Sequence, residues 1–261
     1  MTAPETARKA TELLRLHQAP ELLTVVNVWD AISAKVVTDV PGTRALATAS
    51  HSIAATLGHE DGENIPLAEM LDMVGRIVRA TELPVTADLE GGYGDAAGTI
   101  RRAIDIGVVG ANLEDQVKPL AEAARQVEDV MRVAEQAGVG DFMLNARTDV
   151  FLQAGDRDHG EVLADGTERC RAFLDAGAPV VFVPGFLSED DVAHLVDALG
   201  PQRLTLIGLP GHVPLARLEE LGVARVSFGP VSQNVALTAL QQMVEEVHRG
   251  GTAPEDTRRL N

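Results

Sequence analysis

The sequence has few positive charges, and this scarcity limits the partners it could bind. Its 261 residues include 22 Lys and Arg against 39 Asp and Glu, which gives a formal net charge of −17. Proteins that bind nucleic acids or anionic membrane surfaces need a basic face, because phosphate groups attract Lys and Arg. The basic residues of this chain do not cluster into such a face. We therefore expect neither a nucleic acid nor a membrane as partner.

Cysteines and long apolar runs are equally scarce. The one cysteine, Cys170, excludes an internal disulfide and a cysteine-based zinc site, and it favours a reducing compartment. No apolar run approaches the ~18 residues of a membrane-spanning helix. The first ten residues, MTAPETARKA, lack the apolar segment of a secretion signal. These features predict a cytoplasmic protein.

Short apolar runs alternate with longer amphipathic stretches along most of the chain. This pattern is typical of repeated strand–helix units around a parallel sheet. The length of 261 residues also fits a single barrel of about 250 residues. Eight runs are predicted to be strands, at residues 22–28, 44–49, 84–89, 109–113, 142–146, 179–183, 203–208 and 224–228.

The segments between these runs have helical periodicity. The predicted helices cover residues 5–16, 31–37, 66–80, 96–106, 122–136, 160–175, 189–198, 214–221 and 231–247. An open doubly wound sheet would carry a GxGxxG motif after its first strand, and the chain has none. We therefore predict an α/β fold, a (β/α)8 TIM barrel with an extra N-terminal helix. It forms one domain over residues 1–261, with a polar tail from about 249 to 261.

Polar residues gather where the predicted strands end. Because barrel enzymes take their catalytic groups from the C-terminal ends of strands, these residues are the candidates for function. They lie in five segments, at residues 27–30 (NVWD), 48–52 (TASHS), 88–94 (DLEGGYG), 112–115 (NLED) and 145–149 (NARTD). Trp29 and Tyr93, the only Trp and Tyr of the chain, both belong to this set.

Three carboxylates at neighbouring strand ends indicate a metal site. Asp88, Glu90 and Glu114 would repel one another and raise one another's pKa unless a cation joined them. Oxygen ligands without nearby His or Cys favour Mg²⁺ or Mn²⁺ over zinc. The alternative is that these acids are solvated loop residues in an acidic chain.

Two other residues could bind an acidic ligand. Arg147 could hold a carboxylate or phosphoryl group in two parallel hydrogen bonds, or it could form a structural ion pair with Asp149 or Glu114. Ser50 and the neighbouring amides could take a substrate carboxylate, although a serine in a turn is often a local cap.

The strand-end motifs together resemble one family. Residues 27–31 (NVWDA), 57–63 (LGHEDGE), 88–94 (DLEGGYG), 113–116 (LEDQ) and 145–149 (NARTD) are similar to the isocitrate lyase and phosphoenolpyruvate mutase superfamily. The similarity extends from about residue 13 to residue 247. It implies a Mg²⁺-dependent barrel enzyme that makes or breaks a C–C or P–C bond beside a pyruvate-like enolate.

The resemblance also implies roles for single residues. Asp88 would be the principal metal ligand, and Glu90, Glu114 and Asp61 would hold metal-bound waters. The implied substrate-binding residues are Trp29, Asp30, Ala49, Ser50, His51 and Arg147. The family is usually tetrameric and exchanges a C-terminal helix between subunits, a role that residues 231–247 could fill.

The chain departs from both branches of the superfamily. The lyase branch has a Lys-Cys-Gly-His block after the Glu-Asp pair, whereas residues 116–122 here read QVKPLAE. The phosphonate branch uses an Asn or Thr on the same loop and a His after the sixth strand, which here ends in Val183-Pro184-Gly185. Cys170 lies in a predicted helix and is interpreted as a packing residue.

Another residue would have to replace the missing proton donor. The candidates at the rim are Tyr93, Lys118, His51, His159 and His212, each of which could also be an ordinary loop residue. Arg147, Tyr93 and Lys118 are the catalytic candidates that we select. Residues 152–165 are a candidate lid, and His17, His194 and His248 are expected at the surface of helices.

These features predict a Mg²⁺-dependent lyase that cleaves a C–C bond of a small 2-oxo or 2-hydroxy acid by decarboxylation or retro-aldol chemistry. A phosphonopyruvate or phosphoenolpyruvate mutase or hydrolase is one alternative. A non-catalytic barrel that binds an acid is the other. Loop conformation decides the substrate, and residue spacing does not fix it.

Overall fold

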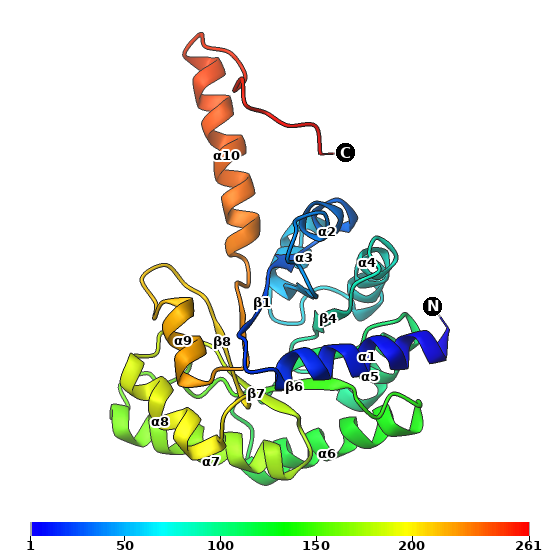
Figure 1. The fold of residues 1–261 in the computed structure, drawn as a ribbon, viewed down its shortest axis with the longest axis vertical. Helices are drawn as coiled ribbons and strands as arrows, with labels where there is room; N and C mark the ends of the chain where they lie inside the picture. The colour runs from blue at the N-terminus through cyan, green and yellow to red at the C-terminus, as the bar shows by residue number, and fades with distance from the viewer. Residues whose placement is uncertain (1, 261) are drawn as a thin grey trace.

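A computed structural model describes residues 2–260 of the chain, and its centre is a parallel barrel (Figure 1). Within these residues one nine-stranded sheet runs in the order β1-β9-β8-β7-β6-β5-β4-β3-β2, and all its pairs are parallel. The strands are β1 (Leu23–Val25), β2 (Asn27–Val28), β3 (Leu46–Thr48), β4 (Val85–Asp88), β5 (Gly110–Glu114), β6 (Met143–Arg147), β7 (Val180–Val183), β8 (Leu204–Ile207) and β9 (Arg225–Ser227).

The first predicted strand, 22–28, closes the barrel by pairing on both sides. Its first part, β1, pairs with β9 through Leu23 and Arg225, and its second part, β2, pairs with β3 through Asn27 and Ala47. Two short strands therefore replace the single strand that was predicted. Together they join the two sides of the sheet, so no strand is left as an unpaired edge. The predicted (β/α)8 barrel class is confirmed.

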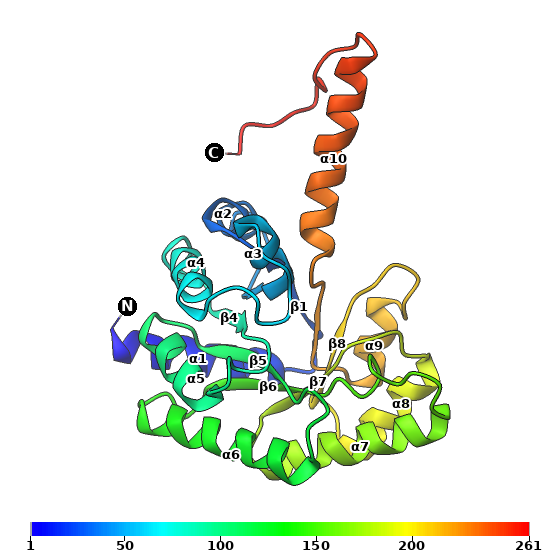
Figure 2. The same ribbon diagram turned by 180° about the vertical axis from the view of Figure 1, so that it is seen from behind.

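Helices surround the barrel, and α1 lies across the end at which the strands begin, which we call the lower end (in front of the strands in Figure 1 and behind them in Figure 2). The helices are α1 (Ala3–Gln18), α2 (Ala31–Thr38), α3 (Ser50–Leu57), α4 (Leu67–Arg79), α5 (Ala96–Asp105), α6 (Leu120–Gln136), α7 (His159–Asp175), α8 (Glu189–Leu199), α9 (Leu215–Leu221) and α10 (Val231–His248). The extra helix α1 lies beneath the N-terminal ends of the strands and contacts β6. A Cβ on Gly110 would come within 2.8 Å of the Met143 carbonyl and 3.1 Å of Leu13, so this contact requires a glycine.

The helix α3, which begins at Ser50 directly after β3, was not predicted from the sequence. Its eight residues, SHSIAATL, are too few for a helical period to stand out, and Ser and Thr have low helix propensity. The helix ends at Gly58, whose φ of 82° is left-handed. Ser50 is therefore a helix N-terminal residue and not part of a turn.

One histidine is placed differently from its expectation. His17 was predicted to lie at the surface of α1, but its side chain is 1% exposed. It belongs to the buried face of α1 together with Ala10, Leu13 and Leu16, at helical spacing. His17 Nδ1 lies 2.8 Å from the Leu13 carbonyl oxygen, and burial lowers the pKa of the imidazole to about 3, with a further contribution from the positive charge of Arg225. His194 and His248 are exposed, as predicted.

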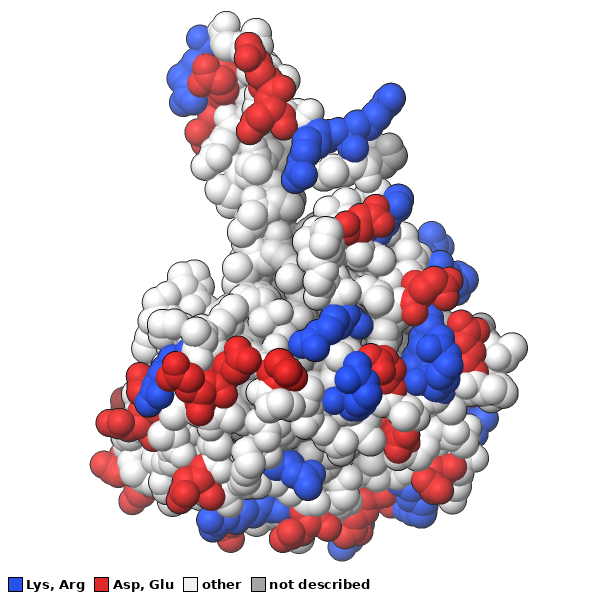
Figure 3. Space-filling model, in the orientation of Figure 1, with Lys and Arg blue, Asp and Glu red and all other residues white. Residues whose placement is uncertain are grey.

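The last helix, α10, projects away from the barrel (Figures 1 and 2). Only Gln233 near its start is buried, whereas Val235, Leu237 and Leu240 are 65%, 53% and 53% exposed. On the face shown in Figure 3, acidic and basic residues are mixed over the barrel. Most of α10 on that face has no charged residue, except near its far end. The residues after α10 that the structure describes, 249–260, have no helix or strand.

None of the helices between residues 2 and 260 combines the length and the apolar composition that crossing a bilayer would require.

Candidate active site

A cavity of about 340 Å³ lies at the C-terminal ends of the strands, where barrel enzymes have their active sites. Its polar lining residues come from β2, β4, β5, β6 and β9 and from the segment after β3, and most of its apolar ones lie in or after β7 and β8 and after β6. The lining residues are Asn27, Ala49, Ser50, His51, Asp61, Asp88, Asn112, Arg147, Leu152, Phe182, Pro184, Gly185, Ile207, Leu209, Ser227, Gly229 and Pro230. Its volume is at the lower end of the about 300–1,000 Å³ typical of small-ligand pockets.

Asp88 and Ser50 form the most polar contact in this cavity. Asp88 ends β4, and Ser50 begins α3. The Ser50 hydroxyl donates to Asp88 Oδ2 over 2.9 Å, and the Ser50 backbone N–H donates to the same oxygen over 3.3 Å. The other oxygen, Oδ1, is buried and accepts no hydrogen bond from any described residue. A buried carboxylate oxygen of this kind is costly unless a ligand or cation satisfies it.

Glu90 and Tyr93 are held by the loop that precedes α4. The Tyr93 hydroxyl donates to Glu90 Oε1 over 2.9 Å, and the Glu63 backbone N–H donates to Glu90 Oε2. In return, the Tyr93 backbone N–H donates to the Glu63 carboxylate. Glu90 and Tyr93 both have positive φ, of 54° and 57°, a conformation that side chains rarely adopt. Such conformations persist where surrounding contacts fix them, as these reciprocal hydrogen bonds do.

Burial changes the titration of these two groups. It raises the pKa of Glu90, although the hydrogen bonds from Tyr93 and Glu63 act in the opposite direction. Burial and the negative charge of Glu90 raise the pKa of Tyr93 as well. Tyr93 therefore stays protonated near neutral pH and can act as a hydrogen-bond donor.

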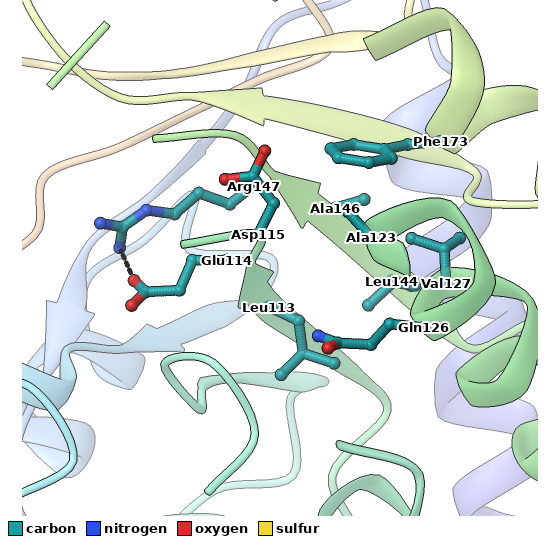
Figure 4. Close-up of a pocket in the computed structure, with 10 residues that line it drawn as sticks. All are labelled: Leu113, Glu114, Asp115, Ala123, Gln126, Val127, Leu144, Ala146, Arg147 and Phe173. Carbon is teal, nitrogen blue, oxygen red and sulfur yellow. Dashed lines mark ion pairs between the residues drawn. The ribbon is translucent and has the colours of Figure 1, made fainter. Parts of the chain in front are cut away.

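Arg147 at the end of β6 is paired with two carboxylates. Its Nη1 lies 3.0 Å from Glu114 Oε2, the contact dashed in Figure 4, and its Nε donates to Asp149 Oδ1 over 2.7 Å. The sequence left open whether Arg147 binds an acidic ligand or forms a structural ion pair with Asp149 or Glu114. In the structure it pairs with both carboxylates. Burial raises the pKa of Glu114 to about 7 even though Arg147 lowers it.

The cavity drawn in Figure 4 also has Glu114 and Arg147 among its lining residues, but it is far smaller and mostly apolar. Its volume is about 10 Å³, and apolar side chains of β5, β6, α6 and α7 form most of its wall, among them Val127 and Phe173. It has room for about one water molecule. The cavity at the mouth of the barrel is therefore the candidate substrate site.

A polar network crosses the interior of the barrel beneath the mouth. Asn112 Oδ1 accepts hydrogen bonds from Asn145 Nδ2 over 2.8 Å and from Arg225 Nη2 over 3.3 Å. Thr205 donates in turn to Asn145 Oδ1 over 2.7 Å. Arg225 is fully buried, and burial lowers its pKa to about 10 although the charge of Asp88 raises it. The sequence analysis did not select Arg225, although a charged residue within an apolar strand was a visible signal.

Asp61 and His51 lie together at the rim of the cavity. Asp61 Oδ2 is 3.6 Å from His51 Nδ1, and both side chains are about half exposed. Ala49 lines the same wall. Of the residues selected from the sequence, the structure therefore brings Asp61, Asp88, Ala49, Ser50, His51 and Arg147 to one cavity.

Other selected residues lie outside it. Asp30 caps α2 by accepting the Ser33 N–H over 2.7 Å, and Trp29 packs against the core from the same loop. Lys118 Nζ lies 3.4 Å from Gln126 Oε1 on α6, and Lys118 does not line the cavity. Glu90 and Glu114 stand beside the cavity without lining it.

Two histidines considered as proton donors also have other partners. His159 begins α7, so the candidate lid over 152–165 is irregular only up to residue 158. Its Nε2 lies 2.8 Å from Asp191 Oδ1. Both ring nitrogens of His212 are engaged, Nδ1 with the Ile207 carbonyl and Nε2 as acceptor of the Leu187 N–H.

The carboxylates at the mouth of the barrel are the donors available to a divalent cation. Across residues 2–260 no three His, Cys, Asp or Glu side chains stand close enough to hold a metal ion together. Mg²⁺, however, keeps several waters and binds proteins through one or two carboxylates. Asp88 Oδ1, buried and without a partner among the described residues, suits one direct contact. Asp61 lines the same cavity, and Glu90 and Glu114 lie close enough for the charge of Asp88 to raise their pKa values. The residues present fit such a cation.

One known sequence family matches most of this chain. The sequence model of a family described as phosphoenolpyruvate phosphomutase matches residues 13–248. The chain belongs to this family. Membership also places it in the isocitrate lyase and phosphoenolpyruvate mutase superfamily, as the strand-end motifs predicted.

Relatives in the family have different activities. An oxaloacetate decarboxylase from Ectopseudomonas mendocina (strain ymp) is 32% identical over 231 residues, which cover 84% of this chain and 78% of the relative. The structure of a protein described as a putative phosphonomutase from Burkholderia cenocepacia J2315 is 40% identical, with a TM-score of 0.86, covering 94% of this chain and 100% of the other. An oxaloacetate acetylhydrolase in complex with the product oxalate is 27% identical, with a TM-score of 0.84, covering 96% and 90%.

Proposed function

We propose that this protein is a divalent-metal-dependent lyase, with Mg²⁺ or Mn²⁺ as its cation. It would cleave a C–C bond of a small 2-oxo or 2-hydroxy carboxylic acid by decarboxylation or retro-aldol chemistry. The observation that carries the proposal is the buried, unpartnered Asp88 Oδ1 beside Ser50 at the mouth of the barrel. Relatives named as acting on oxaloacetate support the class of substrate.

Each residue of the mouth would have a definite task. Asp88 would contact the cation directly, and Glu90, Glu114 and Asp61 would hold the waters around it. The cation, when bound, would stabilise negative charge that develops on the oxygens of the acid. The backbone amides that follow Ser50 at the start of α3 would hold the substrate carboxylate, because a helix N-terminus favours a negative charge. The Ser50 hydroxyl, which donates to Asp88, would keep the carboxylate of Asp88 in place.

Tyr93 and Arg147 would order this arrangement. Tyr93 keeps Glu90 in place by donating its hydroxyl proton to Glu90 Oε1, and it does not line the cavity itself. Arg147 fixes Glu114 and Asp149 and compensates part of their charge. Lys118 is directed toward α6, so its geometry gives no support to a catalytic role.

A substrate panel with and without metal tests the proposal. Oxaloacetate and a series of 2-oxo and 2-hydroxy acids would be incubated with the protein, and pyruvate release would be followed with a coupled assay. We expect turnover of at least one acid with Mg²⁺ or Mn²⁺ and loss of that turnover with a chelator. Binding of oxalate by calorimetry without turnover of any acid would instead identify a non-catalytic acid-binding barrel.

A mutase or hydrolase acting on phosphonopyruvate or phosphoenolpyruvate is the second candidate. The description of the family and the 40% identity to a putative phosphonomutase favour it. Phosphorus NMR distinguishes the two candidates, because a mutase or hydrolase changes the phosphorus signal of phosphonopyruvate. An unchanged spectrum together with pyruvate release from a carboxylic acid would leave the lyase.

We further propose that the protein is a homo-oligomer, a tetramer or a dimer of dimers, and that α10 packs against another subunit. The exposed apolar residues of α10 support this, because a helix with Val235, Leu237 and Leu240 in water loses the burial that usually stabilises helices. Light scattering on the full chain measures the assembly. The cytoplasmic location stays a prediction.

A further inference from the structure

Asn112 connects the mouth cavity with the polar network inside the barrel. It lies on β5 two residues before the strand ends at Glu114, so its side chain stands deeper in the barrel than that carboxylate. Asn112 lines the cavity and is 5% exposed, whereas Asn145 and Arg225 are 1% exposed and do not line it. The network therefore reaches the space of a ligand through Asn112.

The direction of the Asn112 amide follows from its neighbours. A guanidinium only donates hydrogen bonds, so the atom of Asn112 that faces Arg225 Nη2 has to be the oxygen. The same oxygen accepts the hydrogen bond from Asn145 Nδ2. Because both contacts hold the oxygen inside the barrel, the NH₂ group of Asn112 points away from them.

This NH₂ group is a donor that the protein does not use. Asn112 Nδ2 donates to no atom of residues 2–260, and unlike Asp88 Oδ1 it is not fully enclosed by protein. The positive charge of Arg225 at the carbonyl end of the amide polarises the group and makes its N–H a stronger donor. Such a donor binds a negatively charged oxygen more strongly than a neutral one.

We propose that Asn112 is a substrate-binding residue whose Nδ2 donates to a negatively charged oxygen of the acid. The inference rests on the function proposed above and assigns a further residue to its site. Asp88 and Asn112 are register partners on β4 and β5, so their side chains project side by side into the barrel. The charge of Asp88 would repel an anionic oxygen there, and Arg225, acting through the Asn112 amide, offsets part of that repulsion.

Oxalate binding to an Asn112→Thr variant tests the proposal. Threonine suits a strand and keeps an oxygen that can accept a hydrogen bond inside the barrel, but it has no amide nitrogen. Calorimetry on the full-length protein with Mg²⁺ measures the dissociation constant of oxalate. The constant should rise between about tenfold and a hundredfold, the range expected for one lost hydrogen bond to a charged group.

Asn145→Thr is the matched control. Asn145 is the register partner of Asn112 on β6, belongs to the same network and does not line the cavity. The same substitution there should leave the dissociation constant of oxalate close to that of the unmodified protein. Equal losses in the two variants would overturn the inference, because the effect would then come from the network as a whole.

Asn112→Asp provides a second variant in case Asn112→Thr does not fold. Aspartate keeps an oxygen for the hydrogen bonds from Asn145 and Arg225, and Arg225 compensates its charge, but the donor toward the cavity is replaced by an acceptor. Oxalate should bind more weakly than to Asn112→Thr. Leu152→Asp adds the same charge at a cavity-lining position that is 54% exposed, and it should cost much less affinity. Equal losses in the two Asp variants would contradict the proposal, because charge alone would explain them.

Mn²⁺ binding, followed by electron paramagnetic resonance of the free ion, separates the inference from the function on which it rests. Asn112→Thr should bind Mn²⁺ as tightly as the unmodified protein. If its Mn²⁺ affinity falls as far as its oxalate affinity, Asn112 acts through Asp88, and the inference is wrong while metal-dependent acid binding stands. Unchanged oxalate affinity in Asn112→Asp would also overturn it. If the unmodified protein binds neither oxalate nor pyruvate with Mg²⁺, the proposed function fails and this inference fails with it.

Discussion

The two ends of the barrel differ in packing and in charge. The upper end, where the strands end, holds the candidate site, and the lower end, where they begin, is covered by α1. At the upper end, Asp88 Oδ1 is buried without a partner, and Glu90 and Tyr93 hold strained backbone conformations. At the lower end, Leu13 and Leu16 of α1 are fully buried against the starts of the strands. Strain and unsatisfied charge cost stability, whereas apolar burial adds it. The comparison indicates that the lower end stabilises a fold whose upper end is arranged for chemistry.

Asp88→Asn, at the upper end, should have the largest effect of these substitutions, and that effect should be on activity and not on stability. It removes the charge that would contact the cation, so kcat/KM on any acid turned over should fall about a thousandfold, equivalent to several kcal/mol of charge stabilisation. The free energy of unfolding should change by less than about 1 kcal/mol, because the amide oxygen can still accept from Ser50. Steady-state kinetics and urea unfolding measure the two quantities. A fall in the free energy of unfolding as large as the loss of transition-state stabilisation would contradict the proposed division of roles between the two ends.

Leu13→Ala should affect the lower end alone. Leu13 is fully buried, so its truncation should cost about 3 kcal/mol in the free energy of unfolding and leave kcat/KM within about twofold. Its neighbour Leu14 is only partly buried, and Leu14→Ala is the matched control with less than half the cost. Urea unfolding of both variants checks this. Equal costs would contradict the packing assigned to α1.

His17 should make the lower end sensitive to acid. Its pKa is about 3 in the folded protein and about 6.5 when unfolded, so the unfolded chain binds the proton more readily. Its contribution to stability is complete above pH 6.5 and is lost as the pH falls toward 3. Between pH 6.5 and 5 the loss should be about 2 kcal/mol. His17→Gln, which cannot titrate, should lose that much less than the unmodified protein, and identical pH profiles would refute the assignment.

The sequence revealed the strands more fully than the contacts between side chains. All eight predicted strands have counterparts, because strands of a parallel barrel are buried on both faces and appear as short apolar runs. The division of residues 23–28 into β1 and β2 depends on pairing with strands distant in the chain, which no local pattern records. The burial of His17, in contrast, could have been predicted from the sequence, since its position relative to Leu13 and Leu16 follows the helical period.

The candidate site was predictable in the same uneven way. Asp88 and Ser50 could be placed together because strand ends meet at one end of a barrel. The two ion pairs of Arg147 could not be predicted, because several acids lay within reach and only the side-chain rotamers decide which of them it contacts. The apolar lining residues Phe182, Ile207 and Leu209 were also missed, since apolar residues at strand ends look like the rest of the core.

The reciprocal hydrogen bonds between Glu63 and the Glu90–Tyr93 turn have a consequence for protein engineering. The backbone N–H of Glu63 satisfies Glu90, and the carboxylate of Glu63 satisfies the N–H of Tyr93. Barrel enzymes are often regarded as scaffolds whose loops can be exchanged one at a time. In this chain the segments after β3 and β4 constitute one unit, and grafting either of them into another barrel would require the other to accompany it.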